Sequence, residues 1–284
     1  MILQLIINGI VLGCIIALGA IGLSMAYRIL NFANFAHGEF LTLGAYMTFL
    51  FATSGIWFIG ASALSIVVTA LLAIVLDFAV WKPMRSKSAS RTATMILSIG
   101  VALALRNSLV IFFGPDIKRD PLPVTEGISL GAIMITDYQI MVVIIAAAAM
   151  FGVHRLLIRT SLGKAMRALS DNPSLARISG IDVDAIIRYT WALGMGLAAL
   201  SGIMYGLITN INPNMGWFMI LPMFAAAILG GIGNPYGAAA GGIIIGLSQE
   251  ISIAILPGEY KLAVSFAIMI AVLLIKPEGI MGGR

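Results

Sequence analysis

Nine long apolar runs constrain this chain more than any other feature. They lie at about 2–27, 40–53, 59–81, 92–113, 138–157, 187–209, 217–232, 236–256 and 261–275. Charged residues make up only 10% of the sequence, against about a quarter in soluble domains. A bilayer crossing needs roughly 20 apolar residues, so there is room for about eight to ten membrane segments. The sequence predicts an all-α, polytopic transmembrane bundle that forms a single domain over residues 1–284.

Two of the runs, 40–53 and 217–232, are short for a full crossing. We expect either to be a half-helix or a re-entrant segment. The first run has no basic residue before Arg28 and is too long for a signal peptide, so it is predicted to be a retained span. Cys14 is the only cysteine, which excludes an internal disulfide and a thiol metal site and favours a packing role.

The distribution of charge predicts the orientation of the chain. The segments 82–91 and 155–188 are rich in Lys and Arg, whereas 114–137 carries more acidic than basic residues. Because cytoplasmic loops of membrane proteins are enriched in basic residues, the two basic segments should lie inside and 114–137 outside. The order of the spans then places the N-terminus outside, and Arg28 and 276–284 inside.

A polar cluster interrupts the apolar pattern between the first two runs. The stretch LNFANFAHGEF (30–40) contains Asn31, Asn34, His37 and Glu39. Polar groups at membrane depth are tolerated where they line a cavity or are buried in protein. The cluster therefore predicts either a broken helix lining a path or a helix that starts at the interface, with Glu39 near its positive end.

The predicted cytoplasmic loop, at about 159–186, has the signals of two short helices. A first helix fits 163–170. Asn172 is then a typical N-cap and Pro173 a typical first helical residue. Gly180 matches a helix stop with a left-handed residue. Such an ordered loop should either dock against a partner or fold back on its own bundle.

Three charges lie inside or close to the apolar runs. Arg106 and Glu250 are each seven residues from the predicted outer end of their span, which is roughly 10 Å below the surface. An unpaired charge at that depth is costly, so we predict that they form an intramembrane ion pair, either structural or lining the path. Asp77, one turn before Trp81, is expected at the inner interface.

The glycine-rich stretch GGIGNPYG (230–237) is predicted to be a tight turn between two spans. Tyr236 stands where a dinucleotide fingerprint needs its third glycine. A phosphate-binding Walker sequence is also missing, because Ala165 follows Lys164 where Ser or Thr is required. We therefore expect this chain to bind no ATP and no other cofactor itself.

Three stretches resemble branched-chain amino-acid ABC transporter permeases of the LivH type. The first, LNFANFAHGEFLTLGAYM (30–47), is close to that family's LNFAHGEF followed by LGAY. The second, GKAMRALSDNPSLARISGI (163–181), is similar to its ATPase-contacting segment. The third, GGIGNPYGAAAGGIIIGLSQE (230–250), is similar to its glycine-rich C-terminal region. The similarity runs from about residue 5 to 280.

The resemblance implies a transport subunit rather than an enzyme, in the bacterial cytoplasmic (inner) membrane. Its implied partners are a second, LivM-like permease, two cytoplasmic ABC ATPases that use ATP and Mg, and an extracytoplasmic solute-binding protein. No nucleic acid is expected. The substrate path would lie near 31–39, and alternating access would be driven through 163–181. The coupling residues implied are Gly163, Lys164, Arg167, Asn172, Pro173 and Gly180.

Other functions stay open at this point. A permease for urea or short amides belongs to the same class and shares its signatures. An ion-coupled secondary transporter would need no ATPase. An intramembrane enzyme could use His37 and Glu39 as an acid–base pair, but no nucleophile or second metal ligand is suitably spaced beside them.

Overall fold

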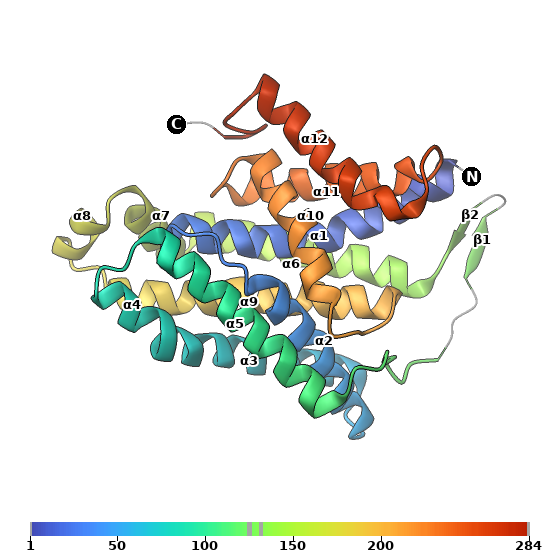
Figure 1. The fold of residues 1–284 in the computed structure, drawn as a ribbon, viewed down its shortest axis with the longest axis horizontal. Helices are drawn as coiled ribbons and strands as arrows, with labels where there is room; N and C mark the ends of the chain where they lie inside the picture. The colour runs from blue at the N-terminus through green and yellow to red at the C-terminus, as the bar shows by residue number, and fades with distance from the viewer. Residues whose placement is uncertain (1, 124–126, 131–132, 283–284) are drawn as a thin grey trace.

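The chain folds into a bundle of helices, described here from a computed structural model for residues 2–123, 127–130 and 133–282 (Figure 1). Each of the nine predicted apolar runs forms a helix. The α-helices are α1 (Ile2–Leu30), α2 (His37–Thr53), α3 (Phe58–Leu76), α4 (Lys82–Ser86), α5 (Arg91–Phe113), α6 (Asp137–Arg159), α7 (Ser161–Asp171), α8 (Pro173–Ile178), α9 (Val183–Ile208), α10 (Met215–Gly230), α11 (Pro235–Ser252) and α12 (Lys261–Ile275). A π-helical turn, η1 (Asp77–Trp81), joins α3 to α4, a 3₁₀ turn, η2 (Gly258–Tyr260), precedes α12, and β1 (Ile128–Leu130) pairs with β2 (Ile133–Ile135).

Within the described residues, 6 helices are long and apolar enough to cross a membrane. They are α1, the continuous helix from α3 to α4, α5, α6, α9 and the helix formed by η2 and α12. The protein is therefore a multi-pass membrane protein, as predicted. The two runs expected to be incomplete crossings are the shorter helices α2 and α10. At about 1.5 Å per residue, the 16 residues of α10 extend only ~24 Å.

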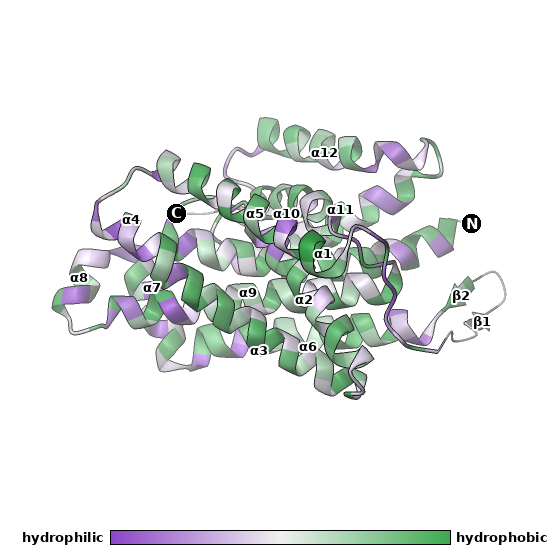
Figure 2. Cartoon of the chain, turned by 60° about the horizontal axis from the view of Figure 1, so that its bottom comes forward, coloured by the Kyte–Doolittle hydropathy of each residue, from purple (hydrophilic) through white to green (hydrophobic). Residues whose placement is uncertain are grey.

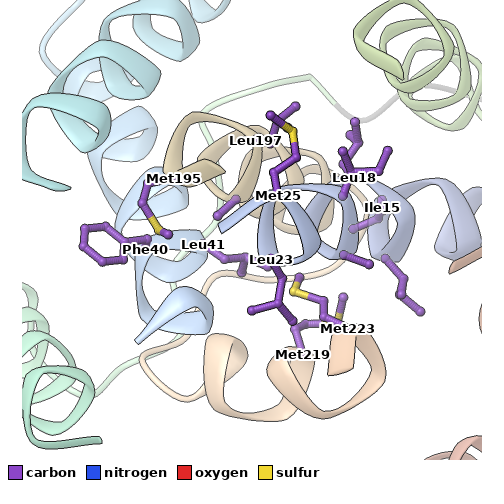
Figure 3. Packing of buried hydrophobic residues seen from close by; sticks show 14 of the residues in the cluster. Ile15, Leu18, Leu23, Met25, Phe40, Leu41, Met195, Leu197, Met219 and Met223 are labelled. Carbon is purple, nitrogen blue, oxygen red and sulfur yellow. The ribbon is translucent and has the colours of Figure 1, made fainter. Parts of the chain in front are cut away.

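The core is centred on α1, which packs against α9, α10 and α11. Figure 3 shows side chains from α1, α2, α9 and α10 meeting around Leu23, Leu41 and Met219. Small residues permit closer contact with α11: a Cβ added at Gly246 would lie 2.3 Å from Cα of Gly13. Such close backbone approach supplies the packing that holds helices together in lipid.

The segments predicted to face the cytoplasm gather at one end of the bundle, with α4, α7, α8 and the C-terminus (Figure 1). Arg28, near the end of α1, donates from Nε to Oγ of Ser170 in α7, at 2.8 Å. Lys82 in α4 pairs with Asp184 at the start of α9, at 2.9 Å. Figure 2 shows hydrophilic residues concentrated on α4, α7 and α8, while the middles of the long helices are mostly hydrophobic.

The segment predicted to be the outer loop lies at the opposite end. Lys118 and Ile211 form an antiparallel bridge, so the loop after α5 pairs with the one between α9 and α10. Gln4 near the N-terminus exchanges two hydrogen bonds with the backbone of Met134 in β2, at 2.9 and 2.8 Å. Residues 124–126 and 131–132 of this predicted loop lie outside the described residues.

The tight turn predicted at 230–237 is present. The helix α10 ends at Gly230, and Gly231 and Gly233 both have positive φ. Asn234 then caps α11 by accepting from the backbone N–H of Tyr236 at 3.0 Å. Asp77, expected at the inner interface, is buried in η1, where Arg85 donates two hydrogen bonds of 2.6 and 2.9 Å to its carboxylate.

Candidate translocation site and docking segment

The polar segment 31–36 leads the chain from the inner end back into the bundle (Figure 1). Asn31 follows the last residue of α1 and has φ +58, a left-handed conformation that Asn tolerates better than most residues. Its backbone N–H still donates to the carbonyl of Tyr27, at 2.8 Å. Asn31 itself is exposed at the inner end, so it lies at the entrance of the segment rather than in its interior.

The interior part of the segment is held by protein groups. Oδ1 of the buried Asn34 accepts from the backbone N–H of Ala36 at 3.1 Å, while its Nδ2 has no partner among the described residues. The backbone N–H of Phe35 donates to Oγ of Ser98 in α5, also at 3.1 Å. Non-helical backbone is tolerated at membrane depth where such protein partners satisfy it.

His37 fixes the start of α2 deep inside the bundle. Its fully buried ring donates from Nε2 to the carbonyl of Gly19 in α1, at 2.9 Å. Gly22 also contacts this ring closely, since a Cβ added there would lie 3.2 Å from Cε1 of His37. These glycines lie 8 to 11 residues before Leu30, roughly 12 to 16 Å from the end of α1. The chain is thus broken before α2, and the helix start is at depth rather than at the interface.

Glu39 lies in the first turn of α2, the helix against which α5 packs. Both helices run in the same direction, because Phe35 contacts Ser98 and, farther out, the rings of Tyr46 and Phe113 lie 4.9 Å apart. Glu39 and Arg106 each precede that aromatic contact by seven residues, close to two full helical turns. They therefore occupy the same level of the two neighbouring helices α2 and α5.

The predicted ion pair between Arg106 and Glu250 is wrong. Nζ of Lys261, the first residue of α12, lies 2.6 Å from Oε1 of Glu250 in α11. The guanidinium of Arg106 instead lies over the ring of Trp217 in α10, 5.4 Å from its centroid. The error arises because α11 packs on α1 and α10, whereas α5 packs on α2, so the two charges share a depth but not a neighbourhood.

The predicted docking segment has the expected caps. The first helix, α7, begins two residues before the predicted 163–170 and ends one residue after it. The side chain of Asn172 accepts from the backbone N–H of Leu175 at 3.0 Å, and Pro173 is the first residue of α8. Gly180 has φ +84, and Ile181 donates to the carbonyl of Ala176 at 3.1 Å, which closes a Schellman motif.

The segment is also anchored to the bundle on one side. Gly163 is buried, and a Cβ there would lie 2.3 Å from the carbonyl oxygen of Leu157 in α6. Arg167 donates to that same carbonyl. Lys164, by contrast, points to the exposed side. The docking segment therefore has a buried face that holds it in place and a free face.

That free face carries apolar side chains outside the spans. Leu175 is 55% exposed and Ile178 82% exposed, both on α8, whereas Leu169 and Ala176 are buried beneath them. Isolated apolar residues on a surface are ordinary, but two on one short, fully capped helix favour a protein contact.

A cavity of about 670 Å³ lies between the docking segment and the beginning of the polar segment. Arg28 and Asn31 line it from the α1 side, Arg167 and Asp171 from α7, and Asn234 from the turn before α11. The two predicted functional regions therefore meet at the inner end of the bundle.

Sequence reasoning missed three residues that complete the region around α2. Ser98 accepts a hydrogen bond from the backbone of the polar segment 31–36, and Trp217 covers Arg106. Phe224 contacts Phe35, with ring centroids 5.1 Å apart. The only signal for Ser98 was a polar residue in an apolar run. Trp217 and Phe224 resemble ordinary membrane residues in sequence.

The fold and these two regions define a class, namely polytopic permeases with a broken helix and a folded loop at one end. Residues 5–273 match the family model described as "Branched-chain amino acid transport system / permease component". The chain belongs to this family.

Two curated relatives match almost end to end. The high-affinity branched-chain amino acid transport system permease protein BraD of Pseudomonas aeruginosa is 32% identical, over 99% of this chain and 95% of its own. LivH of Escherichia coli, with the same description, is 33% identical over the same shares. Among solved structures, PsaBC from Streptococcus pneumoniae in complex with Fab has a TM-score of 0.54 at 16% identity, covering 97% of this chain and 92% of that one. That likeness concerns the fold alone.

Proposed function

We propose that this chain is one permease subunit of an ATP-driven importer for branched-chain or other neutral amino acids in the bacterial cytoplasmic membrane. The near full-length similarity to BraD and LivH is the observation that carries the proposal. ATP and Mg are used by two partner ABC ATPases on the cytoplasmic side, and a solute-binding protein delivers the substrate outside. The basic inner-end segments 82–91 and 155–188 support this orientation.

The docking segment is the contact with an ATPase. Gly163, Arg167 and the α6 carbonyls fix its position, while Lys164 and the exposed side chains of Leu175 and Ile178 form its free face. Asn172, Pro173 and Gly180 give α8 a defined start and end. A rigid segment passes a movement of the ATPase on to the bundle, whereas a flexible segment would deform instead.

A second, LivM-like permease covers the outer half of α5. Asn107 is exposed there and Arg106 is only partly buried, both well within the span. Charged and amide side chains face protein or a water-filled cavity rather than lipid at such depth. Gly100 and Ala104 are exposed on the same helix, and a Cβ at Gly100 would meet nothing within 4 Å, which leaves room for a close helix contact.

Transport proceeds by alternating access. ATP-driven closure of the ATPases displaces α7, and Arg28 passes this displacement to the end of α1 through Ser170 and Asp171. Asn31, which has a left-handed backbone conformation, is the hinge. The angle between α1 and the polar segment 31–36 changes at this residue. The start of α2 then moves relative to α5, which opens the path to one side or the other.

Reconstitution tests the proposal. The chain, its second permease and both ATPases are placed in liposomes with ATP inside and leucine-loaded binding protein outside. We expect uptake of leucine that stops when ATP is omitted. A complex whose ATPase responds to a urea-loaded or amide-loaded binding protein and not to leucine would contradict the substrate. Uptake by the chain alone, driven by an ion gradient, would contradict the ABC mechanism.

A further inference from the structure

Glu39 of α2, Arg106 of α5 and Trp217 of α10 form a polar site inside the membrane. A strip of aromatic side chains extends from this site toward the inner end of the bundle. Glu39 and Arg106 lie at one level, as the shared spacing to Tyr46 and Phe113 requires. The helix α10 reaches the same level, because a Cβ at Gly38 would lie 2.3 Å from the carbonyl of Gly216. The carboxyl of Glu39, the guanidinium of Arg106 and the indole of Trp217, the residue after Gly216, thus converge from three helices.

Neither charge is fully satisfied by the chain itself. Glu39 is 2% exposed, and its Oε2 has no hydrogen-bond partner among the described residues. Arg106 forms no ion pair within the same part of the chain, and its recorded contact is the ring of Trp217. Buried charges that serve only structure are normally paired and hydrogen-bonded. Asp77 with Arg85, and Glu250 with Lys261, follow that rule in this same protein.

An aromatic strip continues from this point toward the inner end. Trp217 is 40% exposed, and Phe224 lies seven residues farther along α10, on the same face and about 10 Å inward. Phe35, in the polar segment 31–36, contacts Phe224. From outside to inside, the carboxyl and guanidinium groups are therefore followed by an apolar aromatic surface.

We propose that Arg106 and Glu39 bind the two charged groups of the transported amino acid, and that Trp217, Phe224 and Phe35 contact its apolar side chain. The Arg106 guanidinium binds the α-carboxylate, for which its planar donors are suited. Glu39 accepts from the α-ammonium once α5 moves away from α2 and uncovers Oε2. This assignment rests on the proposed function, and it adds a site that recognises a zwitterion within the permease, separate from the solute-binding protein.

The test uses the assembled complex without nucleotide and measures equilibrium binding of labelled leucine. Unlabelled leucine, leucinamide (which lacks the carboxylate) and 4-methylpentanoate (which lacks the ammonium) compete. We expect Arg106→Gln to weaken leucine binding about 10- to 100-fold, the effect of losing charge-assisted hydrogen bonds. In that variant leucinamide should compete as well as leucine. In Glu39→Gln, 4-methylpentanoate should become the equal competitor.

Two further variants separate recognition from structure. Thr53→Ala, at the outer end of α2, whose Oγ1 donates to the carbonyl of Phe49 in its own helix at 2.8 Å, should leave binding unchanged. Arg106→Lys keeps the positive charge and should still discriminate against leucinamide. Recovery of leucine binding in the double variant Glu39→Gln with Arg106→Gln would show a structural pair and overturn the proposal. Unchanged discrimination in both single variants would overturn it as well. Failure of the wild-type complex to transport leucine is a distinct result, because it contradicts the proposed function instead.

Discussion

Replacing Gly180 with valine tests whether the shape of the docking segment couples ATP hydrolysis to transport. Gly180 has φ +84, and a Cβ added there meets nothing within 4 Å, so the cost arises from the backbone alone. An L-residue in the left-handed region costs about 1–2 kcal/mol, and a β-branched side chain is among the least tolerant. That free energy lowers the population of the turned conformation about 5- to 30-fold relative to competing ones.

The assay compares ATP hydrolysis and uptake in the reconstituted complex. We expect Gly180→Val to keep a large part of the ATPase rate while uptake per ATP falls several-fold, because the Schellman bond from Ile181 to Ala176 is lost and α8 no longer has a fixed end. Gly180→Asn is the matched control, since Asn adopts the left-handed conformation at low cost. Wild-type uptake per ATP in the valine variant, or equal losses in the valine and asparagine variants, would refute this reasoning.

Three other perturbations have expected outcomes. Gly163→Ala places a Cβ 2.3 Å from the carbonyl oxygen of Leu157; we expect a loss of about 1–3 kcal/mol in thermal stability and weaker retention of the ATPase on affinity resin. Arg85→Ala leaves the buried carboxylate of Asp77 unpaired and should destabilise the protein by about 3–5 kcal/mol in a melting assay, with partial recovery when Asp77→Asn is added. Burial raises the pKa of Asp120 in the outer loop from 3.8 to about 6. The folded state therefore holds a proton that the unfolded state releases, so stability should fall as pH rises from about 4 to about 6, and Asp120→Asn should flatten melting curves over that range.

The spans could be predicted because lipid imposes a simple rule on composition. Each apolar run became a helix, since a backbone in hydrocarbon must satisfy its own hydrogen bonds. The depth in the membrane at which α2 begins was harder to predict from the sequence. It depends on the contact of His37 with Gly19 and on the close approach of Gly38 to Gly216, residues 18 and 178 positions apart in the sequence. A short apolar run can be threaded in several ways, and only such distant contacts select one.

Local geometry was easier to predict than tertiary contacts in the docking segment as well. Asn172, Pro173 and Gly180 act on their own helix ends, so their residue types carried the information. The anchoring of Gly163 against Leu157 could not be inferred in the same way, because a buried glycine and a flexible one are identical in sequence. What fixes the segment to α6 is a contact between two helices whose angle the sequence does not specify.

The wrong pairing of Arg106 with Glu250 shows that the depth of two residues in the membrane does not by itself make them partners. Position along the membrane normal follows from counting residues, but partnership also requires that two helices be neighbours and that the side chains face each other. Glu250 found Lys261, only eleven residues away across the turn into α12. For Arg106 the deciding fact is that α2 and α5 run parallel and touch at Tyr46 and Phe113. Once that contact is known, a spacing of seven residues on both helices brings Glu39 opposite Arg106 without any further assumption.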